Sequence, residues 1–135
     1  MALQTAALRG VDVRLLLPGC SDHALVLHAG RSFLDELLAA GVRILELHDA
    51  MPHAKTATID GIVSTLGSAN MDQRSFRLNF EANVLFFDAD VAAELERDFL
   101  VLCSKAIAIT VISRQGISRS QRLAEGIGRV LAPLL

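Results

Sequence analysis

The sequence predicts an α/β fold in which a mixed β-sheet is flanked by helices. Short β-branched, apolar segments alternate with longer amphipathic ones in the order strand, helix, several strands, helix. An Asp60-Gly61 pair between two short apolar segments is a strong hairpin signal. The 135 residues, 52% of them hydrophobic, are enough for one core, so we expect a single half-domain.

The first half of the chain predicts a strand, a helix and a second strand. Residues 11–17 are apolar and end at a Pro-Gly turn, as a buried strand does. Ser21 or Asp22 can cap a helix through about Ala40, with Gly41 as its C-cap. Residues 42–47 then alternate well enough for a strand.

The second half predicts a hairpin, a loop, a strand and a helix. Two strands over 53–59 and 62–66 are joined by the Asp60-Gly61 turn, and residues 70–79 are polar and predict a loop. A strand over 80–87 follows, and Asp88 or Asp90 can then cap a helix through about Ser104.

The C-terminal segment is basic and predicts an amphipathic helix over 118–131. It divides the chain into a catalytic half-domain, 1–110, and a C-terminal tail, 111–135. Two interpretations of the helix are open: packing of its apolar stripe on the domain, which is the ordinary pattern, or binding to anionic lipid. The stripe comprises Leu123, Ile127, Val130 and Leu131, and the basic side chains are Arg119, Arg122 and Arg129.

Composition excludes several classes of function. The net charge of −2 gives no overall attraction to nucleic acid, so binding of phosphate must depend on local Lys and Arg. Cys20 and Cys103 show no zinc-type spacing and no disulfide framework, which favours a reduced cytoplasmic compartment. Apolar runs are too short to cross a bilayer and no signal peptide is indicated, so we expect no membrane anchor in this chain.

A compact motif carries the chemistry. His53, Lys55 and Asp60 form the pattern H-x-K-x4-D, and a G-S-x-N sequence follows that includes Ser68 and Asn70. An imidazole, a cation and small polar side chains are what a metal-free enzyme needs to attack a phosphodiester through a covalent intermediate. We therefore expect neither a cofactor nor a metal.

Strand periodicity assigns roles to these residues. The two-residue period places His53 and Lys55 on one face, and the pairs Ser68/Asn70 and Glu81/Asn83 follow the same spacing. Lys55, Ser68 and Asn70 are expected to bind phosphate oxygens, and Glu81 to accept a hydrogen bond from the imidazole of His53. Asp60 has the opposite parity, so among the catalytic candidates it receives a supporting role at the turn.

These residues resemble the phospholipase D superfamily, and the whole chain is similar to the C-terminal half of bacterial cardiolipin synthases. Besides the motif, the resemblance involves residues 9–19, 21–23, 41–44, 67–83 and 132–135. It implies a phospholipase D-like fold and transfer of a phosphatidyl group between two phosphatidylglycerol molecules, with loss of glycerol. His53 would be nucleophile or acid/base partner, Lys55 and Asn70 phosphate ligands, and Glu81 the orienting carboxylate.

The resemblance also implies partners. Family members carry two such motifs in one chain, whereas this chain has one, so we expect a truncated or split half that needs a second motif. That motif could come from a homodimer or from a missing N-terminal half. The expected surroundings are phosphatidylglycerol and an anionic bilayer, with the chain peripheral on the cytoplasmic face of a bacterial membrane and without nucleic acid.

Two rival hypotheses stay open. The chain could be a homodimeric, metal-independent phosphodiesterase or endonuclease of the same superfamily. It could also be an inactive fragment that serves as an interaction module, as its highly apolar composition allows.

Overall fold

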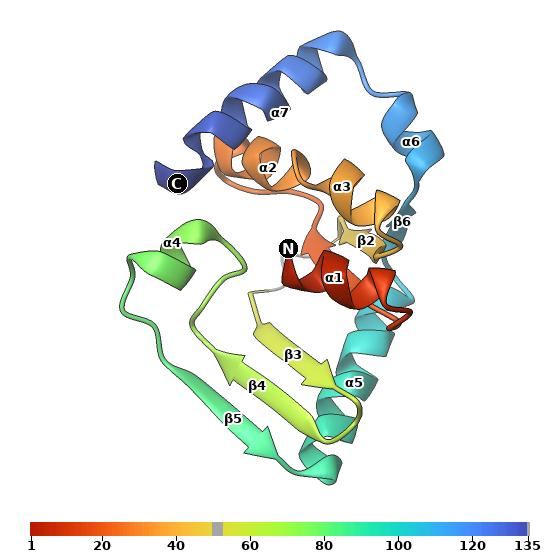
Figure 1. The fold of residues 1–135 in the computed structure, drawn as a ribbon, viewed down its shortest axis with the longest axis vertical. Helices are drawn as coiled ribbons and strands as arrows, with labels where there is room; N and C mark the ends of the chain where they lie inside the picture. Colours follow the sequence, from red (N-terminus) through yellow and green to blue (C-terminus); the bar gives the residue numbers. More distant parts are fainter. Residues whose placement is uncertain (50–52, 135) are drawn as a thin grey trace. The chain divides into compact units, whose positions relative to one another are not determined.

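The computed structural model describes residues 1–49 and 53–134, which form two compact units (Figure 1). The first unit consists of the residues up to 49 together with 106–134, and the second consists of 53–105. Leu135, the last residue of the C-terminal segment noted above, lies outside the described residues. Both units combine helices with a three-stranded sheet, which confirms the α/β class.

A mixed sheet organises the first unit. Its strands are β1 (Arg14–Pro18), β2 (Arg43–Leu47) and β6 (Ile107–Ile109), in the order β1-β2-β6. β1 and β2 are parallel, whereas β6 is antiparallel to β2. The two predicted strands are therefore confirmed, and β6 is an addition that the sequence did not indicate.

Six helical segments complete this unit, and they pack around a small apolar core. Leu34, Val42 and Ile44 are its buried centre. The half-buried residues around them come from α1, β1, α3, β6 and the turn before β1. The helices are α1 (Ala2–Leu8), α2 (Ala24–Arg31), α3 (Leu34–Ala39), α6 (Val111–Gln115), α7 (Arg119–Leu131) and the 3-10 helix η1 (Ala132–Leu134).

The single helix predicted up to Ala40 is wrong, because the chain forms α2 and α3 with a break at Ser32 and Phe33. The Ser32 hydroxyl donates to the carbonyl of Ala29 at 2.6 Å, and such local bonds compete with the helical ladder. The predicted end at Gly41 is confirmed. Gly41 has a φ of +94°, and the amides of Gly41 and Val42 donate to the carbonyls of Leu38 and Leu37, a Schellman arrangement.

Helix α7 packs on α2 through a face that the sequence did not predict. Gly128 lies so close to the α2 backbone that a Cβ there would come within 2.6 Å of the Ala29 nitrogen. Glu125 is also buried, whereas Leu123, Ile127 and Val130 are half exposed or more. The helix therefore packs, as predicted, but the predicted inward face is wrong, since close backbone approach and buried polar contacts decide its orientation.

The second unit is an antiparallel sheet with one long helix. Its strands are β3 (Lys55–Ile59), β4 (Val63–Gly67) and β5 (Asn83–Phe87), in the order β3-β4-β5. Asp60 and Gly61 have φ values of 53° and 66°, as a type I′ turn requires, so the predicted hairpin is confirmed. No helix among the described residues is long and apolar enough to span a bilayer.

Two helices follow the hairpin in the second unit. The loop predicted over 70–79 contains α4 (Gln73–Arg77), a short helix that the Asp72 side chain caps by accepting from the Ser75 amide at 2.7 Å. The later predicted helix is α5 (Ala89–Cys103), and Asp88 is its N-cap. Helix α5 packs on β3 and β4, where Ser64 and Ala92 are almost completely buried.

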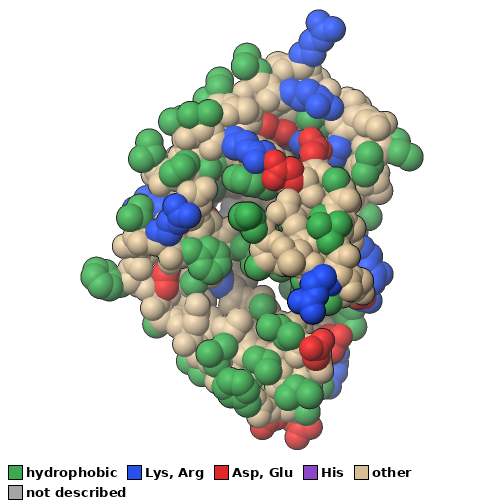
Figure 2. Space-filling view, in the orientation of Figure 1, with side chains coloured by type: hydrophobic (Ala, Val, Ile, Leu, Met, Phe, Trp, Pro, Cys, Tyr) green, Lys and Arg blue, Asp and Glu red, His purple; other side chains and the backbone are tan. Residues whose placement is uncertain are grey.

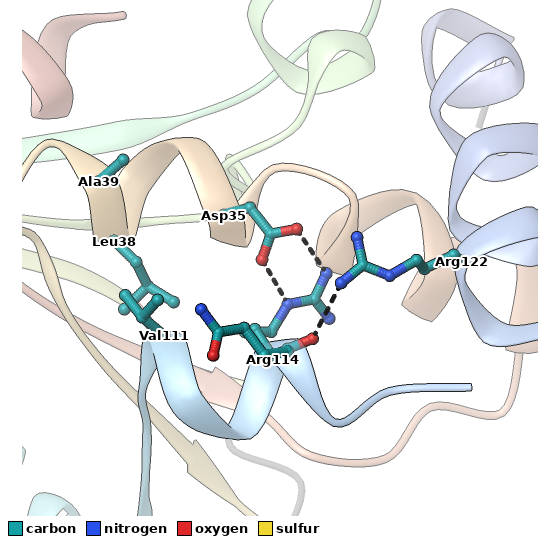
Figure 3. A pocket seen from close by; sticks show the side chains of 7 residues that line it. Asp35, Leu38, Ala39, Val111, Arg114 and Arg122 are labelled. Carbon is teal, nitrogen blue, oxygen red and sulfur yellow. Dashed lines mark hydrogen bonds and ion pairs between the residues drawn. The ribbon is translucent and has the colours of Figure 1, made fainter. Parts of the chain in front are cut away.

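A buried arginine joins three helices of the first unit. Arg114 of α6 donates two hydrogen bonds to Glu125 of α7, at 2.9 and 2.6 Å. It donates two more to Asp35 of α3, which Figure 3 shows. The side chains of Arg114 and Glu125 are only 7% and 6% exposed. Burial alone raises the pKa of Glu125, but the hydrogen bonds from Arg114 and Gln121 outweigh it and leave that pKa lowered.

We expect Glu125→Gln to destabilise the protein by roughly 2 kcal/mol at pH 7, because it leaves the buried Arg114 with less compensating charge. A lowered folded-state pKa gives stability above the unfolded pKa that is lost as pH falls, so the difference should shrink below about pH 4. Urea unfolding at pH 7 and at lower pH measures both effects. Glu36→Gln is the control, since its ion pair with Arg129 is exposed and worth about 0–1 kcal/mol; equal losses in both variants would contradict the expectation.

Candidate functional site

The predicted site residues all lie in the second unit, and all of them except Asp60 gather around the end of the sheet where β3 begins. The register pairs Lys55 of β3 with Gly67 of β4, and Gly67 with Asn83 of β5. Lys55, Gly67 and Asn83 therefore share one face across the three strands. Ser68 and Asn70 follow β4 directly and Glu81 precedes β5, so the hairpin geometry gathers most of the motif at one end of the sheet.

His53 and Lys55 are in direct contact, as the strand period predicted. The Lys55 ammonium lies 3.2 Å from Nε2 of His53 and donates to the carbonyl of His53 at 2.8 Å. An ammonium has no lone pair to offer, so a hydrogen bond between them requires the imidazole to accept at Nε2 and to carry its proton on Nδ1. The imidazole is exposed, and Lys55 is half-buried.

Glu81 is fixed by two neutral donors. The Ser68 hydroxyl donates to one carboxylate oxygen at 2.5 Å, and the Asn79 amide donates to the other at 3.2 Å. The Ser68 oxygen in turn accepts from the Ala82 amide at 3.0 Å. Hydrogen bonding from Ser68, then from Ser75 and Asn79, lowers the pKa of Glu81, and the charge of Lys55 adds to this effect. Glu81 is therefore held as a carboxylate.

Asn83 also belongs to the site, although no role was predicted for its side chain. Its side-chain oxygen accepts from the Ala69 amide at 3.3 Å, which ties the Ser68–Asn70 turn to β5. Gly67 makes room for this contact, because a Cβ at position 67 would collide with the Asn83 side chain and the Ala82 carbonyl. The glycine of the G-S-x-N sequence was the available signal for this contact, because a glycine in a strand often marks a place where another segment approaches closely.

The structure separates Asp60 from the rest of the motif. Asp60 lies in the hairpin turn, seven residues beyond His53 and at the opposite end of β3, which corresponds to roughly 20 Å along an extended strand. Its side chain makes no hydrogen bond with any described residue, so the predicted contact with a loop or backbone amide is not seen. The turn conformation itself accounts for Asp60, because Asp tolerates a positive φ.

One further predicted contact is absent from the described part of the chain. No hydrogen bond there joins Glu81 to His53; the two oxygens of Glu81 bind Ser68 and Asn79. The Asn70 side chain has no hydrogen-bond partner in the same set, although its backbone amide donates to the Ser75 hydroxyl at 3.1 Å. Asn70 is exposed beside Ser68, so its amide remains available to a ligand.

The first unit holds a second buried carboxylate that the sequence did not reveal. Glu46 accepts two hydrogen bonds from Arg31, at 3.0 and 2.8 Å, and His48 approaches it at 3.5 Å. Among residues 1–49 and 53–134, no three His, Cys, Asp or Glu side chains are grouped as a metal site requires. Because Glu46 is already paired with a guanidinium, it serves the structure of this unit.

The arrangement around His53 suits nucleophilic attack on a phosphodiester. It combines an imidazole, an ammonium that lies 3.2 Å from its Nε2, and a turn that carries Ser68 and Asn70 at the same end of the sheet. Such groups stabilise the charge that develops on phosphoryl oxygens during displacement.

Comparison with known proteins places this site in a family. The family described as "Cardiolipin synthase, PLD-like domain" matches residues 1–102. Proteins named cardiolipin synthase are similar over 134 residues, 99% of this chain: one from Geobacillus kaustophilus is 44% identical and one from Listeria monocytogenes serotype 4a is 38% identical. The match covers 27% and 28% of those proteins, so the chain spans about a quarter of their length.

A solved structure supports the fold. The crystal structure of Nuc, a phospholipase D family member from Salmonella typhimurium, superposes with a TM-score of 0.66 at 18% identity. The match covers 81% of this chain and 71% of Nuc. The phospholipase D-like fold predicted from the sequence is thereby confirmed.

We expect Ser68→Ala to raise the pKa of Glu81 toward its ordinary value, because the Ser68 hydroxyl makes the largest contribution to lowering it. NMR titration of the side-chain carboxyl carbon measures the change. Asn79→Ala, which removes the weaker donor to the same carboxylate, should give a smaller rise. An unchanged titration in Ser68→Ala would show that the hydroxyl does not hold Glu81.

We expect Gly67→Ala to destabilise the protein by about 1–3 kcal/mol, because the added methyl group would displace Asn83 or the β5 backbone. Gly126→Ala is the matched control: it lies in α7, where a Cβ meets nothing within 4 Å, and should stabilise by up to about 1 kcal/mol. Urea unfolding measures the free energy of unfolding of both variants. A Gly67→Ala protein as stable as the wild type would refute the close approach of β4 and β5 at this position.

Proposed function

Since the chain belongs to the family of cardiolipin synthase PLD-like domains, we propose that it supplies one of two catalytic motifs of a phosphatidyltransferase. The reaction would join two phosphatidylglycerol molecules into cardiolipin and release glycerol. Residues 1–110 would form the catalytic half-domain. The enzyme would work as a peripheral protein on the cytoplasmic face of a bacterial membrane.

The contact between Lys55 and the imidazole of His53 carries this proposal. In the free protein the Lys55 ammonium shares its protons between the carbonyl and Nε2 of the same residue. A phosphodiester carries a full negative charge, which makes its oxygens stronger acceptors than either group. When these oxygens bind Lys55, Nε2 regains a free lone pair next to the phosphorus.

The reaction then proceeds in two displacements. In the first, Nε2 of His53 forms a bond to phosphorus while the bond from phosphorus to the glycerol oxygen breaks, and the departing oxygen takes a proton from the second motif. In the second, the hydroxyl of another phosphatidylglycerol attacks phosphorus, gives up its proton to the second motif, and displaces His53. Lys55 and Asn70 would bind the non-bridging oxygens in both steps, and Ser68 would join them when its hydroxyl proton turns from Glu81 to the phosphate.

Glu81 would stabilise the imidazolium character that develops on His53. Its lowered pKa keeps it ionised, and the charge of Lys55 contributes to that lowering. Once a phosphate oxygen has taken the hydrogen bond of Lys55, the Glu81 carboxylate would accept a hydrogen bond from Nδ1 of His53. In the free protein, hydrogen bonds from Ser68 and Asn79 hold the Glu81 carboxylate in position.

The second motif would come from outside this chain, either from a second copy or from a longer protein. This follows from the single H-x-K-x4-D pattern and from a length about a quarter that of the relatives. The two-step chemistry needs an acid for the glycerol oxygen that His53 cannot supply while it acts as nucleophile. The roles of His53 as nucleophile or as that acid depend on which motif receives the first lipid.

We expect His53→Ala to abolish formation of a phosphatidyl adduct, because Nε2 is the attacking atom. A nitrophenyl ester of phosphatidic acid provides a leaving group that needs no acid, so the first displacement can be measured in this chain alone. Mass spectrometry of the protein after incubation with vesicles of this ester and a chelator should show an acid-labile adduct on His53 in the wild type.

Asp60→Asn is the control, because Asp60 lies in the turn and Asn also accepts a positive φ. It should form the adduct at the wild-type rate within about twofold. An adduct that persists in His53→Ala, or a wild type that forms none, would overturn the assignment. Cardiolipin made from phosphatidylglycerol would show in addition that the chain completes a two-motif site.

A further inference from the structure

The segment between Asn70 and Glu81 turns its apolar side chains outward. We call residues 71–80, which include α4, the rim loop, because site residues lie at both of its ends. The apolar side chains of this loop are among the most exposed in the second unit, ranging from 61% at Met71 to 108% at Phe80. The others are Phe76 and Leu78, both 69% exposed.

Polar contacts, and not apolar packing, hold the rim loop in place. Ser75 is buried; its amide donates to Asp72 and its hydroxyl accepts from the Asn70 amide. The carbonyl of Arg74 accepts from the amides of Leu78 and Asn79 at 2.8 and 2.9 Å. The loop thus has polar groups inside and apolar groups outside, the reverse of the usual arrangement in water.

The rim loop carries positive charge that no acidic side chain of the loop compensates. The guanidinium groups of Arg74 and Arg77 make no hydrogen bond or ion pair with any described residue. Asp72, the only acid of the loop, uses its carboxylate to cap α4. Figure 2 shows hydrophobic and basic side chains lying together over the part of the molecule where Figure 1 draws α4.

We propose that the rim loop docks the site onto an anionic phospholipid bilayer. Arg74 and Arg77 bind lipid phosphates, and the phenyl rings of Phe76 and Phe80 enter the boundary between headgroups and acyl chains. A two-fold contact between two rim loops fits less well, because both loops carry the same positive charge. The inference rests on the proposed function for its lipid, and docking by this loop would place the site at the membrane surface.

Vesicle flotation of the full chain tests the inference. Phe76→Ser/Phe80→Ser should weaken binding to phosphatidylglycerol vesicles at least about tenfold, because the inserted apolar area is lost. Arg74→Gln/Arg77→Gln should weaken it about 30-fold on phosphatidylglycerol, with little change on phosphatidylcholine. Leu123→Ser/Ile127→Ser is the control: it removes two exposed apolar side chains, 67% and 50% exposed, from α7 and should bind within twofold of wild type.

Several results would overturn the inference. These are wild-type binding by both rim-loop variants, an equal loss in the α7 control, or a change from dimer to monomer in the phenylalanine variants with vesicle binding unaltered. Phe80→Ser alone guards against misfolding, since this fully exposed ring supports no packing. His53→Ala separates the two proposals, because it should bind vesicles normally while forming no adduct. If the wild type binds vesicles but forms no adduct, the proposed function is refuted and the docking surface is retained.

Discussion

The close approach of β4 and β5 at Gly67 is the constraint on which the site depends. Gly67 lies between Lys55 and Asn83 in the register, and the space where its side chain would stand is occupied by the Asn83 carboxamide. Through that carboxamide the Ala69 amide is held, and with it the turn that presents Ser68 to Glu81. A residue without a side chain therefore sets the position of Asn83, of the turn after β4 and of Ser68 beside Glu81.

The two units solve the problem of a small core in different ways. The first buries Leu34, Val42 and Ile44 and then adds paired charges, with Arg31 on Glu46 and Arg114 on Glu125. The second buries little more than Ser64 and Ala92 beneath α5 and relies on the antiparallel ladder and on side-chain bonds to the backbone. Such hydrogen bonds fix the polar groups of the site without an apolar lining. The apolar side chains of the rim loop are therefore not used for packing within the unit and stay exposed.

Local signals predicted much of the fold, and long-range contacts account for what they missed. The Asp60-Gly61 turn, the Gly41 cap and strands β1 to β5 depend on residues near one another in sequence, and each was predictable. The face of α7 was not, because it follows from Gly128 against Ala29 and from Arg114 reaching both Glu125 and Asp35, contacts that span up to 79 positions in the chain. In the site, the period of two predicted the pair His53 and Lys55, whereas the partners of Glu81 depended on where α4 places Asn79.

The choice of lysine at position 55 follows from the need to move a charge between acceptors. Its ammonium is a compact cation with three donors on a flexible stem, and in the free protein it serves the carbonyl and Nε2 of His53 together. A planar guanidinium would fit one bidentate partner and would release it less readily. In the proposed function, a phosphodiester would take the cation from the imidazole at little geometric cost, so the nucleophile would become available when a negative charge arrives and would remain engaged in its absence. Binding of the phosphodiester and activation of the nucleophile would then be the same event.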